Sequence, residues 1–212
     1  MPVLNIFNLG EVCLWGIWKI EEDESTLQSK ILATGYTEGQ PIITHQKKRI
    51  EWLSSRLLIH SLLEKFGKPF YGIVNDFYGK PHLRNYSDYH VSLSHCNDYS
   101  VAILHKSTQV GIDIELLKDK LRLVTRKFLS EDEISQVVGD DKKLCVYWCV
   151  KEVVYKLHGT KVISLKNNIF IHPFDFKLSG GKCKADLIFE NKKTSFQLTY
   201  LCINNYFIAF NH

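Results

Sequence analysis

The sequence VGIDIE, residues 110–115, constrains the fold of this chain more than any other stretch. Its run of β-branched apolar residues predicts a strand, in which residues i and i+2 point to the same side. Asp113 and Glu115 therefore project together, while Ile112 and Ile114 face the opposite way into a core. An acidic pair on an internal strand needs compensation by a metal ion or by partner charges.

A second segment, WCVKEVVYK at 148–156, has the spacing of a helix. Trp148, Glu152 and Lys156 form one i, i+4, i+8 stripe, which would bring a third carboxylate and an ammonium group to the strand if it faces it. Mg²⁺ favours such a site, with few protein carboxylates and open positions for water and phosphate oxygens. Mn²⁺ remains an alternative. Taken alone, Glu152 and Lys156 would instead be an ordinary ion pair on an exposed helix, but Trp148 on the same stripe argues against full exposure.

These two segments together resemble the signature of the 4′-phosphopantetheinyl transferases. Two upstream stretches fit in the same order, GKPHL at 79–83 and VSLSH at 91–95. The resemblance runs from about residue 45 to about residue 160. Glu115, and a length near twice that of the small trimeric holo-acyl-carrier-protein synthases, resemble the monomeric, surfactin-synthetase-activating type.

The resemblance implies transfer of the 4′-phosphopantetheine arm of coenzyme A to a serine of an apo acyl or peptidyl carrier protein. The reaction would depend on Mg²⁺ and release adenosine 3′,5′-bisphosphate. By resemblance, Asp113, Glu115 and Glu152 bind the metal, and Asp113, Glu152 and Lys156 serve catalysis. Glu152 would also help to deprotonate the serine, and Lys156 would contact the coenzyme A pyrophosphate.

By resemblance, the first half of the chain contacts coenzyme A. Ser94 and His95 would bind the 3′-phosphate, although His95 could instead be a buried, satisfied histidine. Lys80 would reach the nucleotide phosphates, or else be an exposed turn lysine. Arg49 and Arg56 are candidates for adenosine-phosphate contacts, with a solvated basic face as the alternative. A nucleophile–base pair of Ser94 and His95 is disfavoured, because adjacent strand residues point oppositely.

The composition indicates an ordinary globular protein. The chain has 212 residues, with 45% hydrophobic and 24% charged residues, and its net charge of +4 does not by itself indicate a nucleic acid partner. The six cysteines are scattered without a Cys-x-x-Cys motif, so we expect reduced thiols, no structural zinc and a cytoplasmic protein. The apolar patch at 12–20 is too short to span a membrane. We expect a monomer that binds neither membranes nor nucleic acid.

Each half of the chain is predicted to contain a strand, helices and further strands. Helices are expected from an acidic start at 21–25 to about 32, from a Thr44 cap to 66, after a Ser130 capping box, and at 141–158 before Gly159. Strands are expected at 12–20, 70–74, 91–94, 100–105, 110–116, 175–178, 184–189, 195–203 and 206–210, with hairpin turns at 180–181 and 204–205. This order predicts an α+β fold of two similar α/β halves, 1–108 and 109–212, related by pseudo-twofold symmetry. The active site is expected in the cleft between them.

Two functions of other classes use similar residues. A metal-dependent nuclease would use Asp, Glu and Lys with Mg²⁺, but typically with Glu-x-Lys on a strand rather than Glu-x-x-x-Lys on a helix. A non-catalytic relative that binds coenzyme A or a carrier protein is the other, although the three carboxylates and the lysine are all retained. A basic stretch could dock an acidic carrier protein or be a solvated face: Lys118, Lys120, Arg122, Arg126 and Lys127.

Overall fold

The computed structural model describes residues 3–36, 42–160 and 162–212. The chain divides into two compact units, Met1–Val110 and Gly111–His212. Each unit combines an antiparallel sheet with helices, and each has its own hydrophobic core. The predicted α+β class is therefore confirmed.

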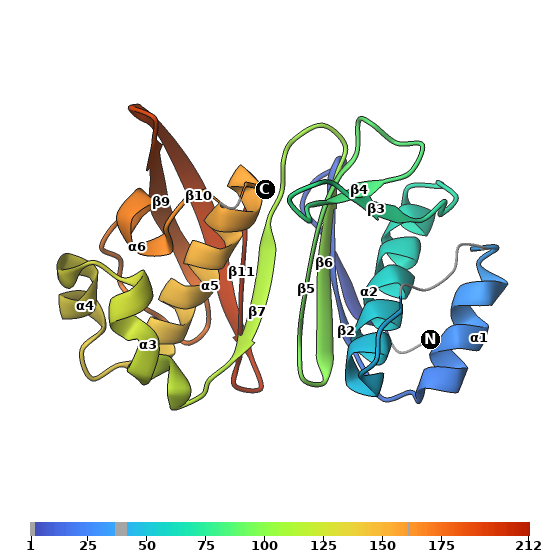
Figure 1. Cartoon of the computed structure of the whole chain (residues 1–212), viewed down its shortest axis with the longest axis horizontal. Coiled ribbons are helices and arrows are strands. Elements are labelled where there is room, and N and C mark those ends of the chain that lie inside the picture. Colours follow the sequence, from blue (N-terminus) through green and yellow to red (C-terminus); the bar gives the residue numbers. More distant parts are fainter. Residues whose placement is uncertain (1–2, 37–41, 161) are drawn as a thin grey trace. The chain divides into compact units, whose positions relative to one another are not determined.

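The N-terminal unit has a six-stranded sheet and two helices (Figure 1). Helix α2 packs against the central strands of the sheet and α1 packs against α2, which buries the apolar face of α2. The strands, in spatial order, are β1 (Val3–Asn8), β2 (Cys13–Lys19), β6 (Tyr99–His105), β5 (His90–Cys96), β4 (Pro81–Leu83) and β3 (Ile73–Asn75), and the helices are α1 (Glu24–Ala33) and α2 (Gln46–Lys65).

Two features of this unit differ from the sequence predictions. The N-cap of α2 is His45, which makes no side-chain cap hydrogen bond, so the prediction of a Thr44 cap was wrong. Instead, the Thr44 carbonyl accepts a hydrogen bond from Arg49, which anchors the chain just before the helix. Strand β1 was not predicted, because its side chains lack a clear alternating pattern.

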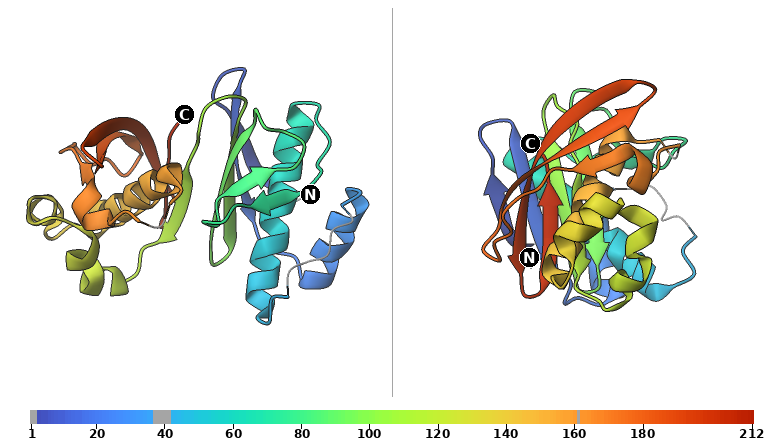
Figure 2. Two further views of the ribbon diagram at one scale, coloured as in Figure 1. Left: turned by 45° about the horizontal axis from the view of Figure 1, so that its top comes forward. Right: turned by 90° about the vertical axis from the view of Figure 1, so that its left-hand side faces the viewer.

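The C-terminal unit has a five-stranded sheet that curls around α5 (Figure 2). Helix α5 lies along the sheet, and α3, α4 and α6 pack around it. The strands, in spatial order, are β7 (Ile112–Leu116), β11 (Tyr206–Phe210), β10 (Lys192–Ile203), β9 (Gly181–Phe189) and β8 (Ile169–Ile171), and the helices are α3 (Lys120–Phe128), α4 (Glu131–Val137), α5 (Asp141–His158) and α6 (Leu165–Asn168).

The local signals for helices in this unit are confirmed. The hydroxyl of Ser130 accepts from the backbone N–H of Glu133, whose carboxylate accepts from the backbone N–H of Ser130, and this capping box opens α4. Helix α5 ends at Gly159, which takes the left-handed conformation with φ 76°. Asn204 and Asn205 form the β10–β11 turn with φ of 49° and 65°.

Two predictions for this unit were wrong. The strand expected at 175–178 is absent, because the backbone N–H of Lys177 donates to the Tyr200 hydroxyl instead of to a strand; β8 lies earlier in the chain. Residues 180–181 do not form the expected hairpin turn, because the strand expected before them is absent and Gly181 is the first residue of β9. The turn between β9 and β10, at Glu190 and Asn191 with φ of 50° and 60°, was not predicted. The basic stretch after β7, for which no secondary structure was predicted, contains helix α3.

Two further expectations concern the environment of the protein. All six cysteines, each within the described part of the chain, are free thiols. No helix among the described residues is both long enough and apolar enough to cross a membrane.

Candidate functional site

Strand β7 presents its two acidic residues to helix α5. It pairs with β11, so that Asp113 lies opposite Ala209 and Glu115 lies opposite Phe207. Both side chains contact residues of α5, as the strand alternation predicts. Asp113 is only 4% exposed. A carboxylate this deep in the unit needs a compensating cation.

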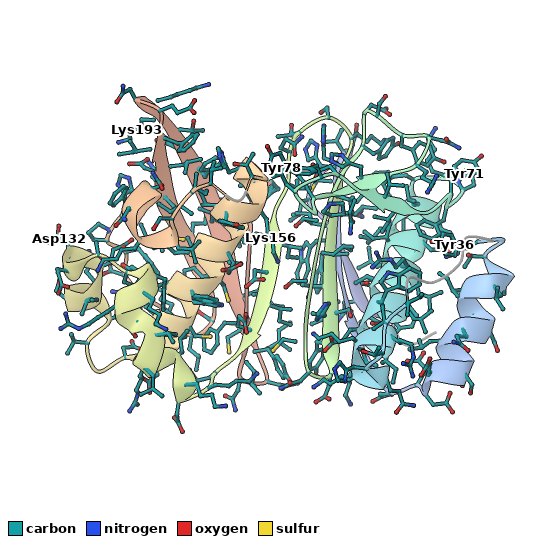
Figure 3. The ribbon with its side chains drawn as sticks, viewed as in Figure 1. Tyr36, Tyr71, Tyr78, Asp132, Lys156 and Lys193 are labelled. Carbon is teal, nitrogen blue, oxygen red and sulfur yellow. The ribbon has the colours of Figure 1, made fainter. Side chains whose placement is uncertain are left out.

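Lys156 supplies a positive charge to Asp113. Its Nζ donates to Asp113 Oδ1 over 2.8 Å and to the backbone carbonyl of Ile112 over 2.8 Å. The side chain extends from α5 towards β7 (Figure 3). The alternative of an exposed Glu152–Lys156 pair is therefore wrong, because the partner of Lys156 lies on the strand.

Trp148 fixes the second carboxylate of the strand. Its indole N–H donates to Glu115 Oε1 over 3.0 Å. The Trp148 ring meets the ring of Phe128 edge to face, with centroids 4.8 Å apart, which holds the indole in place. Burial, followed by the charge of Asp113, raises the pKa of Glu115, and the hydrogen bond from Trp148 opposes this rise.

Glu152 is the third carboxylate of the stripe and lies between Trp148 and Lys156 on α5. Burial first, and then the charge of Asp113, raises the pKa of Glu152 to about 7, with a smaller contribution from Glu115. The three carboxylates are therefore close enough to repel one another. The stripe predicted from the sequence is brought to the strand as expected.

Gly111 allows α5 to approach β7. A Cβ atom at this position would lie 2.8 Å from the backbone oxygen of Val153 and 3.2 Å from Leu157 Cγ. Because the Val153 oxygen belongs to the helix backbone, it cannot move without moving α5. The glycine of the VGIDIE segment is thus a packing requirement of the site.

The donor chemistry of these residues suits a divalent metal ion. Asp113, Glu115 and Glu152 offer hard oxygen ligands of the kind that Mg²⁺ prefers, and a divalent cation would relieve their repulsion. As the side chains are placed, no group of three or more His, Cys, Asp or Glu among the described residues could hold a metal ion. The metal site therefore stays a prediction from the donor set.

A pocket of about 240 Å³ opens beside Glu115. Its walls are largely apolar, and two lysines, Lys118 and Lys120, contribute to its lining. The remaining lining residues are Leu116, Leu121, Val124, Cys145 and Trp148. This pocket was not predicted, because it depends on how α3 packs against α5.

In the N-terminal unit, His95 lies at the end of β5 and faces helix α2. Its Nδ1 is 3.3 Å from Glu51 Oε2, and the same carboxylate oxygen accepts from Lys48 Nζ over 2.6 Å. Lys47 donates to the side chain of Asn97 over 3.3 Å. Two lysines and a histidine thus gather at the start of α2. The basic run 47–49 indicated this cluster, but the predicted ligand was Arg49 rather than Lys47 or Lys48.

Ser94 does not join this cluster. It precedes His95 on β5, so strand alternation directs its side chain to the opposite face of the sheet. This arrangement agrees with the prediction that the two residues do not form a nucleophile–base pair.

Lys80 lies near the other end of β5. Its charge contributes, after burial, to lowering the pKa of His90, the first residue of β5. His90 and His95 are five residues apart, roughly 16 Å along an extended strand. Lys80 and His95 therefore do not form one compact phosphate site, although they can contact separate groups of an extended ligand.

The two predicted arginines have structural partners. Arg49 forms a bidentate ion pair with Glu24 at 2.6 and 3.0 Å and donates to the backbone carbonyls of Ile43 and Thr44, which joins α1 to α2. Arg56 stacks on the Trp52 ring at 4.3 Å, and burial lowers its pKa to about 10. The structure thus does not bring either arginine to the His95 cluster.

Comparison with known proteins gives the same family as the motifs. Residues 109–210 match the model of the 4′-phosphopantetheinyl transferase superfamily. A 4′-phosphopantetheinyl transferase of Bacillus pumilus, psf-1, is 29% identical over 114 residues, which are 50% of this chain and 48% of that protein. The 4′-phosphopantetheinyl transferase AcpT of Escherichia coli O157:H7 is 28% identical over 142 residues, 64% of this chain and 69% of that protein.

Strand β7 with its carboxylates and helix α5 with its lysine both lie within the matched region. Through residues 109–210, the chain is similar to the 4′-phosphopantetheinyl transferase superfamily. It spans about half the length of the Bacillus relative. Membership of the monomeric, surfactin-synthetase-activating type remains a prediction.

Proposed function

We propose that this chain is a 4′-phosphopantetheinyl transferase, which moves the phosphopantetheine arm of coenzyme A to a serine of an apo acyl or peptidyl carrier protein. The observation that carries the proposal is the arrangement of Asp113 and Glu115 on β7 against Glu152 and Lys156 on α5. It lies in the unit that matches the superfamily model. The similarity to two proteins named as such transferases supports the same activity.

In the proposed reaction, the serine oxygen forms a bond to the phosphorus that carries the pantetheine arm. The bond from this phosphorus to the bridging oxygen of the pyrophosphate breaks, and adenosine 3′,5′-bisphosphate leaves with that oxygen. Glu152, on the stripe of α5 that meets β7, would accept the serine proton as general base. Lys156 would neutralise charge on the pyrophosphate.

Asp113, Glu115 and Glu152 are the residues that would hold Mg²⁺. The bound ion would supply charge neutralisation on the pyrophosphate, which is the main requirement of phosphoryl transfer. Trp148 would keep Glu115 aimed at the ion through its hydrogen bond of 3.0 Å.

The 3′-phosphate of coenzyme A would bind at the start of α2 in the N-terminal unit. His95, Lys47 and Lys48 lie there, and the first backbone N–H groups of the helix have no side-chain cap. Such N–H groups and cations favour a phosphate. Ser94, Lys80, Arg49 and Arg56 are weaker candidates, because the first two lie away from this cluster and both arginines already have structural partners.

The carrier protein would dock on α3. Carrier proteins of this kind are acidic around the modified serine, and Lys118, Lys120 and Lys127 would meet those charges. Leu123 on the same helix is 82% exposed and offers an apolar contact. Arg122 and Arg126, also predicted to dock the carrier, form ion pairs with Asp141 and Glu131.

Mass spectrometry of an apo carrier protein incubated with coenzyme A, Mg²⁺ and this protein tests the proposal. We expect a mass gain equal to one phosphopantetheine arm, lost with chelator or with Asp113→Ala. Binding of coenzyme A without any mass gain on several carrier proteins would support the non-catalytic alternative. Cleavage of DNA at low salt would support the nuclease alternative.

A further inference from the structure

Lys151 precedes Glu152 on α5, so its side chain points about 100° away from that of Glu152 around the helix. Its side chain is 0% exposed, and its ammonium group has three acceptors. It donates to Glu133 Oε2 over 2.7 Å, to the carbonyl of Leu165 over 2.9 Å and to the carbonyl of Ile169 over 2.5 Å. All three donor positions of the ammonium are thereby used.

Glu133 is equally well fixed. It is 3% exposed, and besides Lys151 it accepts from the backbone N–H of Ser130 over 2.9 Å and from that of Ile171 over 2.8 Å. Ser130 caps α4, and Ile171 belongs to β8. The Lys151–Glu133 pair thus joins α5 to α4, to the first residue of α6 and to β8.

We expect that the Lys151–Glu133 ion pair is not needed for the stability of the unit. A buried ion pair loses its hydration, and replacing such a pair with neutral side chains of similar size is often neutral or stabilising. The apolar contacts around it already supply a driving force for packing. A different role is needed to explain why this helix buries a lysine.

Helix α5 needs a directional contact because part of it is buried all the way round, while Trp148, Glu152 and Lys156 are only half-buried. Residues 144–147 are four consecutive buried positions, which together span a full helical turn. Apolar burial is non-directional, so it distinguishes poorly between rotations of such a helix. Hydrogen bonds from Lys151 to fixed acceptors allow one rotation only.

This rotation determines which side chains meet β7. With Lys151 held on the side of α4 and β8, the stripe of Trp148, Glu152 and Lys156 faces the strand. There Trp148 donates to Glu115 and Lys156 donates to Asp113. A shift by one residue would turn the stripe by about 100°. The carboxylate of Glu152 would then leave the other two.

We propose that the buried Lys151–Glu133 pair is a positioning device, which sets the rotation of α5 and so holds Glu152 beside Asp113 and Glu115. This inference rests on the proposed function for its kinetic test, but it also predicts how metal ions stabilise the protein. Neither residue would touch substrate, so both act through Glu152.

The test compares Lys151→Met with the double variant Glu133→Gln/Lys151→Met. The single variant leaves a buried carboxylate without its cation and should lower the melting temperature. The double variant should recover most of that loss. Small misplacements of reacting groups lower the reaction rate strongly. The kcat of the double variant should therefore fall by about tenfold to a hundredfold, with KM for coenzyme A nearly unchanged. The rise in melting temperature on adding Mn²⁺ should also shrink.

A matched control removes a lysine–carboxylate pair that does not touch α5. Lys193 lies 2.8 Å from the buried Asp186 in the β9–β10 hairpin. The variant Lys193→Met/Asp186→Asn should change stability, but not kcat or the stabilisation by Mn²⁺.

Wild-type kcat and a wild-type response to Mn²⁺ in the Glu133→Gln/Lys151→Met variant would overturn the inference. If that variant does not fold, Glu133→Gln alone tests the inference, because Lys151 keeps two carbonyl acceptors in this variant and the protein should fold. A lower kcat at unchanged KM would support the positioning role. An unchanged kcat would overturn it. If the unaltered protein transfers no phosphopantetheine, the proposed function fails, and the Mn²⁺ response still tests the positioning.

Discussion

The indole N–H of Trp148 on α5 donates to a carboxylate oxygen of Glu115 on β7 over 3.0 Å. This bond joins the two segments whose pairing carries the family signature. The bond also fixes the orientation of the Glu115 carboxylate in the candidate metal site, because a carboxylate with one oxygen hydrogen-bonded has less rotational freedom. The consequences for metal binding can be measured.

Replacing Trp148 with Phe should weaken metal binding with little effect on the fold. Phe retains the contact with Phe128 but lacks the N–H that holds Glu115. A hydrogen bond to a charged group contributes roughly 1.5–3 kcal/mol, so the Mg²⁺ concentration for half-maximal transfer should rise about tenfold or more. Trp18→Phe removes an indole bond to Glu22 in the N-terminal unit and is the control. Equal Mg²⁺ dependence in both variants would contradict the role of Trp148.

Glu152→Gln should lower turnover at saturating coenzyme A while leaving the protein as stable or more stable without metal. The neutral amide removes a half-buried charge that Asp113 and Glu115 repel. Steady-state kinetics and thermal melts in the presence of chelator provide the two measurements. Glu190→Gln, at the exposed β9–β10 turn, should change neither. Normal turnover in Glu152→Gln would remove this residue from the reaction.

Gly111→Ala should reduce both stability and turnover. The new Cβ would lie 2.8 Å from the backbone oxygen of Val153, so α5 must move away from β7. Overpacking of this kind costs roughly 1–3 kcal/mol. In Gly16→Ala the nearest atom is the end of the Leu58 side chain, at 3.0 Å, which can rotate, so the loss should be smaller. Melting curves and transfer assays of the two variants make the comparison.

His95→Ala should weaken binding of coenzyme A more than binding of its 3′-dephosphorylated form. Only coenzyme A carries the phosphate proposed to bind beside His95, Lys47 and Lys48. A charge-assisted hydrogen bond of roughly 1.5–3 kcal/mol corresponds to a loss of about tenfold to a hundredfold. Calorimetric titration with both ligands measures the difference, and His172→Ala in the C-terminal unit is the control. Equal losses for the two ligands would mean that His95 is structural.

Asp186 should make the C-terminal unit sensitive to acid. Burial alone would raise the pKa of Asp186, but hydrogen bonds from Lys193, Ser195 and His172 outweigh burial and lower it to about 2. Because the folded pKa is depressed, the stabilisation is complete above the ordinary pKa of 3.8 and is lost as the pH falls towards 2.

Asp186→Asn should therefore melt at a lower temperature than the wild type at pH 6, and this difference should shrink steadily between about pH 4 and pH 2. Thermal denaturation across this range measures it. Asp175→Asn, at an exposed position of the same unit, should show no such convergence. A constant difference for Asp186→Asn would show that the ion pairs of Asp186 do not contribute.

Much of the candidate site was determined by the sequence alone, because it depends on short periodicities. A period of two placed Asp113 and Glu115 on one side of a strand, and a period near four placed Trp148, Glu152 and Lys156 on one stripe of a helix. The start of α4 at the Ser130 capping box and the end of α5 at Gly159 were also predictable, because each depends on hydrogen bonds or backbone angles within a few residues. The α+β class followed from the order of these elements.

Tertiary structure decided what depends on residues far apart in the chain. Lys156 donates to Asp113, and Arg49 is engaged by Glu24, because packing brings these charges together across many intervening residues. Nothing local in the sequence indicated that Lys151 would be buried against Glu133, since helical spacing gives the face of a lysine but not its partner. The sequence defines which side chains share a face, and only the packed structure determines what each face meets.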